Sequence, residues 1–313
     1  MRRRRGNDVC WCGRSAKYKR CHGDRAALDD RRPVALGAAA PSGVVPGAIA
    51  RPPYLATGGV PAPAGLQIVT GADLDRLRHA GRVAAVVLAE AGAAVAAGVT
   101  TAELDAIAHD AYVREGAYPS TLGYRGYRHS VCTSVNEVAC HGIPDSRSLL
   151  DGDIVNIDVT AYVGGYHGDT SATYVVGAAP ALLLDLVATT EASLWAGIDA
   201  VRPGRPVRDI GRATQAVAAA RGYGVVDLYG GHGIGTAFHA APHIHHVDEP
   251  RATTVMVPGM AFTIEPMLTI GTTDLVPWAD GWTEVTADGL PSAQFEHTVV
   301  VTDTGAELVT VAG

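Results

Sequence analysis

Apolar and polar positions follow a helical spacing in two separate parts of the chain. From Thr70, an N-cap candidate, apolar residues recur three and four positions apart to about residue 97, and Gly98 ends the run. A second run of this kind covers residues 101–116. Residues 181–201 and 207–221 repeat the pattern, with Arg-Pro-Gly between them. We therefore predict two pairs of helices.

Strand-like alternation follows each pair of predicted helices. Residues 131–140, 154–163 and 166–175 alternate, and Gly164 with Gly165 predicts a hairpin between the last two. Residues 230–311 contain several more short apolar runs separated by Pro and Gly. The order predicts an α+β fold of two similar halves, with one continuous sheet and the helices on one side. Sequence identity between the halves is too faint to establish a repeat.

Proline and glycine set residues 26–65 apart from the rest of the chain. Proline at this density removes backbone donors and prevents a regular helix or a central strand. We predict a semi-extended linker, or a strap that lies along the body, and a globular domain over residues 66–313.

Composition and charge narrow the class of protein. The 313 residues are 47% hydrophobic and 18% charged, which excludes a wholly disordered chain. The net charge of −7 is uneven, because residues 1–32 hold 11 Lys and Arg against 4 Asp and Glu. The remaining body is acidic, and an acidic surface disfavours nucleic acid as its main partner.

The cysteines and the apolar segments indicate in which cellular compartment the protein is expected. Five cysteines are an odd number and poor material for a disulfide scaffold. No apolar segment follows Arg2 to Arg5, so a secretory signal is not expected. Residues 83–99 are rich in alanine and contain Glu90, which favours a packed helix over a membrane span. We expect a cytoplasmic protein with no membrane partner.

Two aspartates interrupt the apolar pattern of the predicted hairpin. Asp158 and Asp169 fall on adjacent or diagonal positions of its two strands and point to one face. Like charges are costly to bury together unless they share a proton or a cation. The hairpin alone leaves two interpretations open, a metal site or acid dyad on the one hand and two solvated aspartates near a turn on the other.

Three further features favour the metal interpretation. His232 and His239 lie in a glycine-rich stretch, where a ligand can approach the backbone. Glu265 and Glu296 each interrupt an apolar strand, where an acid is rarely buried without a partner. Four carboxylates and one histidine suit two divalent first-row ions better than structural zinc. Such a centre favours hydrolysis of an amide or phosphoester, with His141 and His239 hydrogen-bonded to the carbonyl oxygen or the oxyanion.

The runs that carry these residues resemble type I methionine aminopeptidases. They are NEVACHGIP (136–144), GDIVNID (152–158), GYHGDT (165–170), GHGIG (231–235), TIEP (263–266) and QFEH (294–297), in unbroken order within residues 66–313. The resemblance implies the pita-bread fold, with duplicated α/β halves around a curved, mainly antiparallel sheet. It also implies removal of the initiator methionine from nascent chains whose second residue is small.

The resemblance also assigns roles to individual residues. It implies a dinuclear centre in which Asp169 and Glu296 bridge the ions and Glu265 shuttles a proton; the ligands are Asp158, Asp169, His232, Glu265 and Glu296. His141 and His239 are expected to steer the scissile amide and stabilise its tetrahedral intermediate. The methionine side chain is expected in an aromatic pocket, where a thioether packs well; its wall is Tyr124, Tyr127, Cys132, Phe238 and Trp282.

The sequence departs from the family pattern at two places and shows one weaker similarity to it. Thr121 stands where many relatives have Cys, and residues 289–291 replace a more polar segment, so we expect some difference at the pocket mouth. Asn136, Val138 and Ser292 resemble a monovalent-cation site that some relatives have. The identity of the divalent metal, among cobalt, manganese, iron, zinc and nickel, does not follow from the ligands.

Residues 1–32, which we call the basic head, carry a second set of candidate metal ligands. Cys10, Cys12, Cys21 and His22 are enough for a tetrahedral structural zinc, and their spacing resembles the small zinc motif at the tail of the SecA translocation ATPase. We predict a zinc knuckle over residues 1–25 that contacts the ribosome through its positive charge. The alternative is a disordered basic tail with incidental cysteines.

The sequence thus predicts a monomeric, dinuclear metallo-aminopeptidase that acts on the N-termini of nascent polypeptides. Two alternatives stay open. One is a Pro-specific aminopeptidase or dipeptidase of the same fold, and the other is a catalytically inactive, ribosome-associated binding protein.

Overall fold

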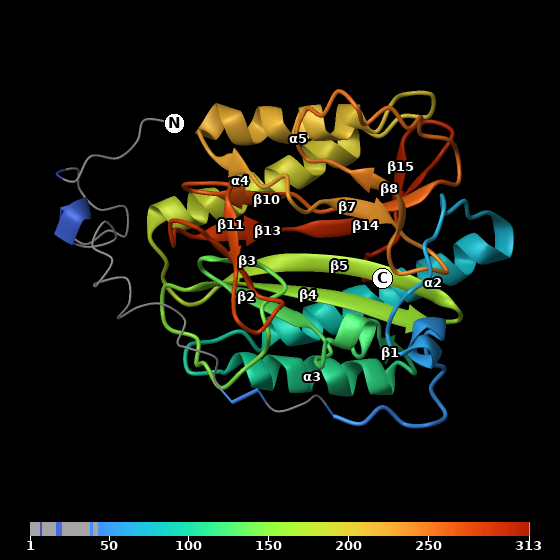
Figure 1. The fold of residues 1–313 in the computed structure, drawn as a ribbon, viewed down its shortest axis with the longest axis horizontal. Helices are drawn as coiled ribbons and strands as arrows, with labels where there is room; N and C mark the ends of the chain where they lie inside the picture. The colour runs from blue at the N-terminus through green and yellow to red at the C-terminus, as the bar shows by residue number, and fades with distance from the viewer. Residues whose placement is uncertain (1–6, 8–16, 21–37, 40–42, 313) are drawn as a thin grey trace.

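A curved antiparallel sheet of nine strands runs through both halves of the chain (Figure 1). The computed structural model describes residues 7, 17–20, 38–39 and 43–312. The main sheet has the order β1-β4-β5-β14-β9-β7-β8, with β2 on β4 and β15 on β14. Its strands are β1 (Tyr118–Pro119), β2 (Cys132–Val135), β4 (Ile154–Val163), β5 (Tyr166–Val175), β7 (Gly231–Gly233), β8 (Ala240–Ile244), β9 (Ala261–Ile264), β14 (Glu296–Val301) and β15 (Ala306–Leu308).

Two small sheets flank the main one. The first joins β13 (Ser292–Gln294), β10 (Met267–Thr269) and β6 (Gly224–Val225). The second joins β11 (Leu275–Pro277), β12 (Glu284–Thr286) and β3 (Val138–Cys140). The predicted strand over 131–140 is therefore two strands, because Asn136 adopts a left-handed conformation with φ 53° and turns the chain between β2 and β3.

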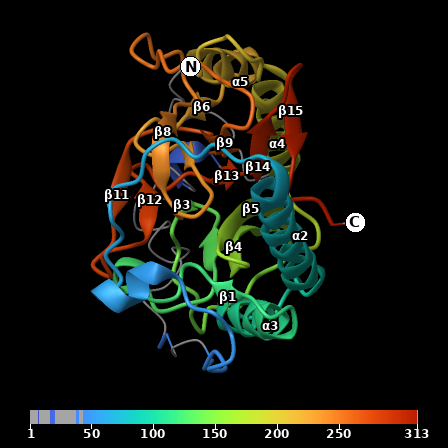
Figure 2. The ribbon, with the colours of Figure 1, turned by 90° about the vertical axis from the view of Figure 1, so that its right-hand side faces the viewer.

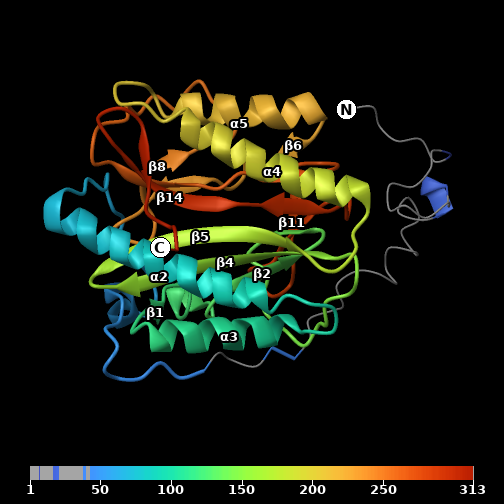
Figure 3. The same cartoon turned by 180° about the vertical axis from the view of Figure 1, so that it is seen from behind.

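The long helices cover one side of the sheet, as predicted (Figures 2 and 3). They are α2 (Gly71–Ala93), α3 (Thr101–Arg114), α4 (Ala181–Asp199) and α5 (Arg208–Arg221), and the short 3-10 helices are η1 (Tyr18–Arg20), η2 (Pro53–Thr57) and η3 (Tyr124–Gly126). Helix α2 lies on β4 and β5, and α4 lies on β10 and β13. Helix α2 ends at Ala93, before the predicted residue 97, because residues 94–99 form turns and Gly98 has φ 92°.

Each half of the chain has its own hydrophobic core. In the first half, Leu104 of α3 and Ile157 of β4 belong to one fully buried cluster. In the second half, Ile210 of α5 and Phe262 of β9 belong to another. Two helix pairs with separate cores on one continuous sheet confirm the predicted architecture. Helix α4 is long and apolar enough to cross a membrane by length and composition, and here it packs against α5 and β13.

The hairpin of β4 and β5 sets the position of the two aspartates. All ten residues of β4 pair with β5, and Gly164 and Gly165 turn the chain with φ 61° and 86°. Asp158 pairs with Ser171 and Asp169 pairs with Thr160, so the aspartates occupy diagonal positions. This is one of the two arrangements that the sequence predicts.

Residues 43–65, which we call the strap, lie along the body. The strap contains η2, and its Tyr54 is buried against Tyr124 with the ring centroids 5.1 Å apart. The carbonyl of Gly59 accepts a hydrogen bond from the Arg125 amide at 2.8 Å. A Cβ atom at Gly59 would overlap the carbonyl oxygen of Gly123, so glycine is required for this close approach. The segment is packed and partly helical rather than simply extended.

Candidate active site

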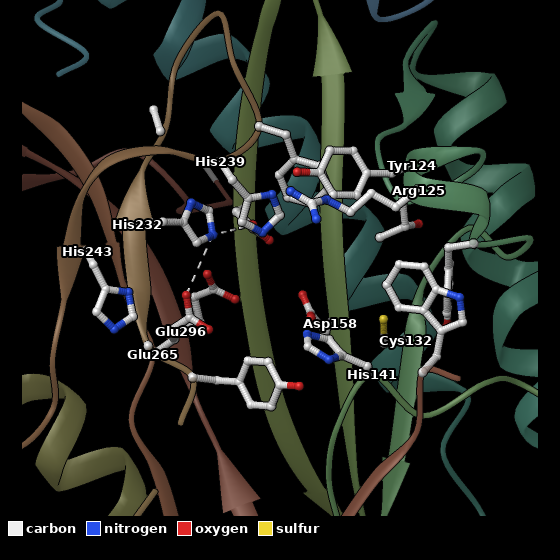
Figure 4. Close-up of a pocket in the computed structure, with 18 of the residues that line it drawn as sticks. Tyr124, Arg125, Cys132, His141, Asp158, His232, His239, His243, Glu265 and Glu296 are labelled. Carbon is white, nitrogen blue, oxygen red and sulfur yellow. Dashed lines mark ion pairs between the residues drawn. The ribbon is translucent and has the colours of Figure 1, made fainter. Parts of the chain in front are cut away.

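A cavity of about 440 Å³ collects the residues that the sequence singles out (Figure 4). Every predicted metal ligand, both predicted histidines and the whole predicted methionine pocket line it. They are Asp158, Asp169, His232, Glu265, Glu296, His141, His239, Tyr124, Tyr127, Cys132, Phe238 and Trp282. These residues come from both halves of the chain, and the fold brings them together on the face of the sheet away from the long helices.

Four carboxylates and one imidazole meet at the centre of this cavity. Ligand atoms of Asp169, His232 and Glu296 all lie within 4.8 Å of one another. The Nε2 atom of His232 lies 3.7 Å from Asp169 Oδ2 and 3.7 Å from Glu265 Oε1. Figure 4 shows Asp158 beside this group, on the strand next to that of Asp169.

The electrostatics of this cluster fit a bound cation. Burial raises the pKa of Asp158 to about 7 and that of Glu265 to about 8. Burial, together with the neighbouring carboxylates, also raises the pKa values of Asp169 and Glu296. Glu296 Oε1 is buried and has no hydrogen-bond partner among the described residues. Divalent cations satisfy such an oxygen-rich set, whereas in their absence the carboxyls retain protons.

Hydroxyl and amide groups fix the orientation of the ligands. Thr160 donates to Asp169 Oδ1 at 2.8 Å, and Gln294 donates to Glu265 Oε2 at 3.2 Å. The hydroxyl of Thr263 donates to Glu265 Oε1 at 2.8 Å and accepts from the amide of His232 at 3.0 Å. These contacts hold the carboxylates and the imidazole in fixed directions, as supporting residues do around metal sites.

Two histidine contacts add to this support. His232 Nδ1 lies 3.2 Å from the carbonyl oxygen of Gly233; when Nδ1 donates to that oxygen, Nε2 is left free to face the carboxylates. The backbone amide of Glu265 donates to Nε2 of the buried His246 at 3.0 Å. Sequence reasoning missed Thr160, Thr263 and His246. The one signal in the sequence concerned the two threonines. Thr160 is two residues from Asp158 and Thr263 is two residues from Glu265, a spacing that puts side chains on the same face of an extended chain.

His141 and His239 lie on either side of the carboxylates in Figure 4. His141 follows β3 with φ 55°, and burial lowers its pKa to about 4, so its imidazole is neutral at pH 7. The ring of His239 lies 4.1 Å from that of His232 and 5.1 Å from that of Tyr124. Both histidines therefore face the space above the carboxylates, where a neutral imidazole can donate a hydrogen bond to an oxyanion.

Aromatic rings form one end of the cavity. Tyr124 packs on Phe238 with centroids 4.8 Å apart, and Tyr127 packs on Trp282 at 5.0 Å. Cys132 also lines the cavity as a buried free thiol, on β2 directly opposite Asp158 of β4. This apolar, polarisable lining suits an unbranched side chain that contains sulfur.

The remaining predicted residues have different outcomes. Thr121 lines the cavity. Residues 289–291 are not among the described residues that line it. The amide of Ser292 donates to the carbonyl of Asn136 at 2.9 Å, so these two residues of the predicted monovalent-cation site are adjacent. The predicted zinc ligands Cys10, Cys12, Cys21 and His22 lie outside the described residues.

Both the sequence and the fold of this chain are similar to those of known proteins. A model of metallopeptidase family M24 matches residues 75–303, and a SEC-C motif matches residues 7–24. Methionine aminopeptidase 2 of Mycobacterium tuberculosis is 50% identical over 283 residues, which are 90% of this chain and 99% of that protein. Methionine aminopeptidase of Escherichia coli K12 is 48% identical over 79% of this chain and 94% of that protein.

Solved structures agree with this assignment. The crystal structure of methionine aminopeptidase from Rickettsia prowazekii is 42% identical, with a TM-score of 0.77 over 79% of this chain and 100% of that chain. The pita-bread fold that the resemblance implies is therefore confirmed. The chain belongs to metallopeptidase family M24, among its type I methionine aminopeptidases.

Proposed function

We propose that this metal-dependent aminopeptidase removes the N-terminal methionine from nascent polypeptides whose second residue is small. One observation carries the proposal, namely that a five-ligand carboxylate and histidine cluster and an aromatic, thiol-containing wall share one cavity. The wall binds the methionine side chain by apolar and sulfur–aromatic contact. The cluster lies where the scissile amide of a substrate held by that wall would be.

Asp158, Asp169, His232, Glu265 and Glu296 would hold two divalent cations, with Asp169 and Glu296 bridging. Bound divalent cations supply Lewis acidity and lower the pKa of coordinated water. Ligand atoms of Asp169 and Glu296 lie within 4.8 Å of one another, which supports the shared role that the resemblance implies for them. The free terminal amine of the substrate would bind at this centre, which would select for the ends of chains.

The chain's own residues carry out the remaining steps. His141 and His239 donate hydrogen bonds to the scissile carbonyl oxygen and to the oxyanion that develops from it. Glu265 accepts the proton of the nucleophile and delivers it to the leaving amine. Burial keeps its pKa near 8 without a cation, and the hydrogen bonds from Thr263 and Gln294 hold its carboxylate in place.

Peptide hydrolysis separates this function from the two alternatives. The enzyme, loaded with manganese, cobalt or iron, should release methionine from Met-Ala-Ser but not from Met-Lys-Ser, and should leave Xaa-Pro peptides intact. Asp169→Ala is the control that should release nothing. Cleavage of Ala-Pro would favour the Pro-specific peptidase, and no release from any peptide would favour the inactive binding protein.

For the head, we propose a zinc knuckle over residues 1–25 followed by a Pro-rich connection over residues 26–65. The SEC-C match at residues 7–24 supports zinc binding by Cys10, Cys12, Cys21 and His22. Metal analysis of the full chain should find one zinc more than in the Cys10→Ser, Cys12→Ser double variant. An equal zinc content would contradict the assignment.

The basic charge of the head supports contact with the ribosome. Co-sedimentation with ribosomes should be salt-sensitive and should be lost when residues 1–25 are removed; persistence after that removal would rule out the contact. We also propose a cytoplasmic, monomeric enzyme and a monovalent cation near Asn136, Val138 and Ser292. Sedimentation at several protein concentrations tests the monomer.

A further inference from the structure

Glu284 is a buried acid beside the active-site cavity that the proposed reaction does not use. It begins β12, is 8% exposed and is not among the residues that line the cavity. Its Oε1 atom accepts a hydrogen bond from the Tyr229 hydroxyl at 2.9 Å. Its Oε2 atom is buried with no hydrogen-bond partner among the described residues. Burying a carboxyl group with one unpaired oxygen costs folding free energy, and the hydrogen bond from Tyr229 offsets part of that cost.

This hydrogen bond joins two walls of the cavity that are distant in sequence. Glu284 pairs with Cys140 in the small sheet of β3 and β12, and it follows Trp282 of the aromatic end by two residues. Tyr229 precedes β7, and its ring stands edge-on to His141 with centroids 5.0 Å apart. The hydrogen bond of its hydroxyl to Glu284 and the contact of its ring with His141 leave the Tyr229 side chain little freedom to rotate.

In the substrate orientation proposed above, the second residue would pass Tyr229. The aromatic end of the cavity receives the methionine side chain, and the carboxylates face the scissile amide. Of the other lining residues, Thr121 and Arg125 are close in sequence to Tyr124 of the aromatic end, and the chain beyond the amide would meet the remaining ones, Leu228, Tyr229, Gly230, Ala240 and His243. Tyr229 is the largest ring in this part of the lining, so its position limits the room for the second side chain.

We propose that Glu284 is a positioning residue that restricts the second substrate residue to small side chains by holding Tyr229 against His141. This inference rests on the proposed function and adds the residue that sets its selectivity. Without the hydrogen bond, the Tyr229 ring can turn away from His141 and admit a branched second residue. Hydrolysis of the amide itself needs no contact with Glu284, so the reaction with a small second residue is largely retained.

The test compares kcat/KM for Met-Val-Ser with kcat/KM for Met-Ala-Ser. Glu284→Val and Tyr229→Phe should each raise this ratio by about tenfold, the effect of losing one hydrogen bond to a charged group. The double variant should show the same ratio as either single one, because both remove the same bond. Glu284→Gln keeps an acceptor oxygen and should stay near the wild-type ratio.

Thr286→Val is the matched control. Thr286 lies on the same strand, is 2% exposed and donates its hydroxyl hydrogen bond to the Leu290 carbonyl instead. Wild-type ratios in both Glu284→Val and Tyr229→Phe, or an equal rise in Thr286→Val, would overturn the inference. If Glu284→Val does not fold, Tyr229→Phe decides alone. Failure of the wild-type enzyme to cleave Met-Ala-Ser would instead refute the proposed function.

Discussion

Thr263→Val tests how strongly one hydroxyl organises the candidate metal centre. Thr263 is fully buried on β9, and its hydroxyl bridges the His232 amide and the Glu265 carboxylate. Valine has the same shape, so the change removes only this bridge. It leaves a buried N–H without a partner and a carboxylate with one donor fewer, at a cost of about 1–3 kcal/mol for each group. We therefore expect the free energy of unfolding to fall by roughly 3 kcal/mol.

The same change should also weaken metal binding. Because the two residues that lose a contact, His232 and Glu265, are both proposed ligands, affinity for Mn²⁺ or Co²⁺ should fall by about 10–100-fold. Calorimetric titration of the metal-stripped enzyme in competition with a chelator measures this change. The matched control is Thr190→Val, since Thr190 is equally buried and its hydroxyl donates to the Leu186 carbonyl of α4, away from the proposed ligands. Affinities in Thr263→Val and Thr190→Val that agree within twofold would refute the reasoning.

Three further predictions follow from the same geometry. Asp169→Ala should abolish peptide hydrolysis at any metal concentration, and near-normal turnover would contradict its bridging position. The metal-stripped enzyme should lose thermal stability as the pH rises from about 5 to about 8 and then level off, because over that range the folded state still holds protons on Asp158 and Glu265, whose pKa values are raised to about 7 and about 8, that the unfolded state has already lost; metal-loaded enzyme should show no such loss, and parallel melting curves would argue against this. Gly81→Ala should lower the melting temperature by several degrees, because its Cβ would overlap the carbonyl of Val309, whereas Gly47→Ala has open space and should not.

The sequence singled out the acids that line the cavity because acids inside apolar strands are unusual wherever they occur. Asp169 and Glu296 could be found on that signal without any knowledge of their neighbours. The hairpin turn alone predicted adjacent or diagonal positions for the aspartates, and the structure has the diagonal one. The helices were equally accessible, since their periodicity is local and depends little on tertiary contacts.

The missed features depend on contacts between distant segments. Nothing in the local sequence distinguishes Glu284 from an exposed acid on an edge strand, because its partner Tyr229 is 55 positions away. His246 is similar, since its bond to the Glu265 amide forms only when β8 and β9 come together. The split of the predicted strand at Asn136 reflects a single left-handed residue, whose conformation the alternation of side chains does not reveal.

The strap gives the aromatic end of the cavity a second layer. Tyr54 supports Tyr124 from behind, and its hydroxyl donates to the carbonyl of Ser120, yet it precedes residues 75–303, which the M24 family model covers. An inhibitor that stays within the cavity meets residues that the family model describes. One that pushes Tyr124 aside meets Tyr54, which that model does not include. Compounds built to reach this second layer would therefore distinguish enzymes that have the strap from enzymes that lack it.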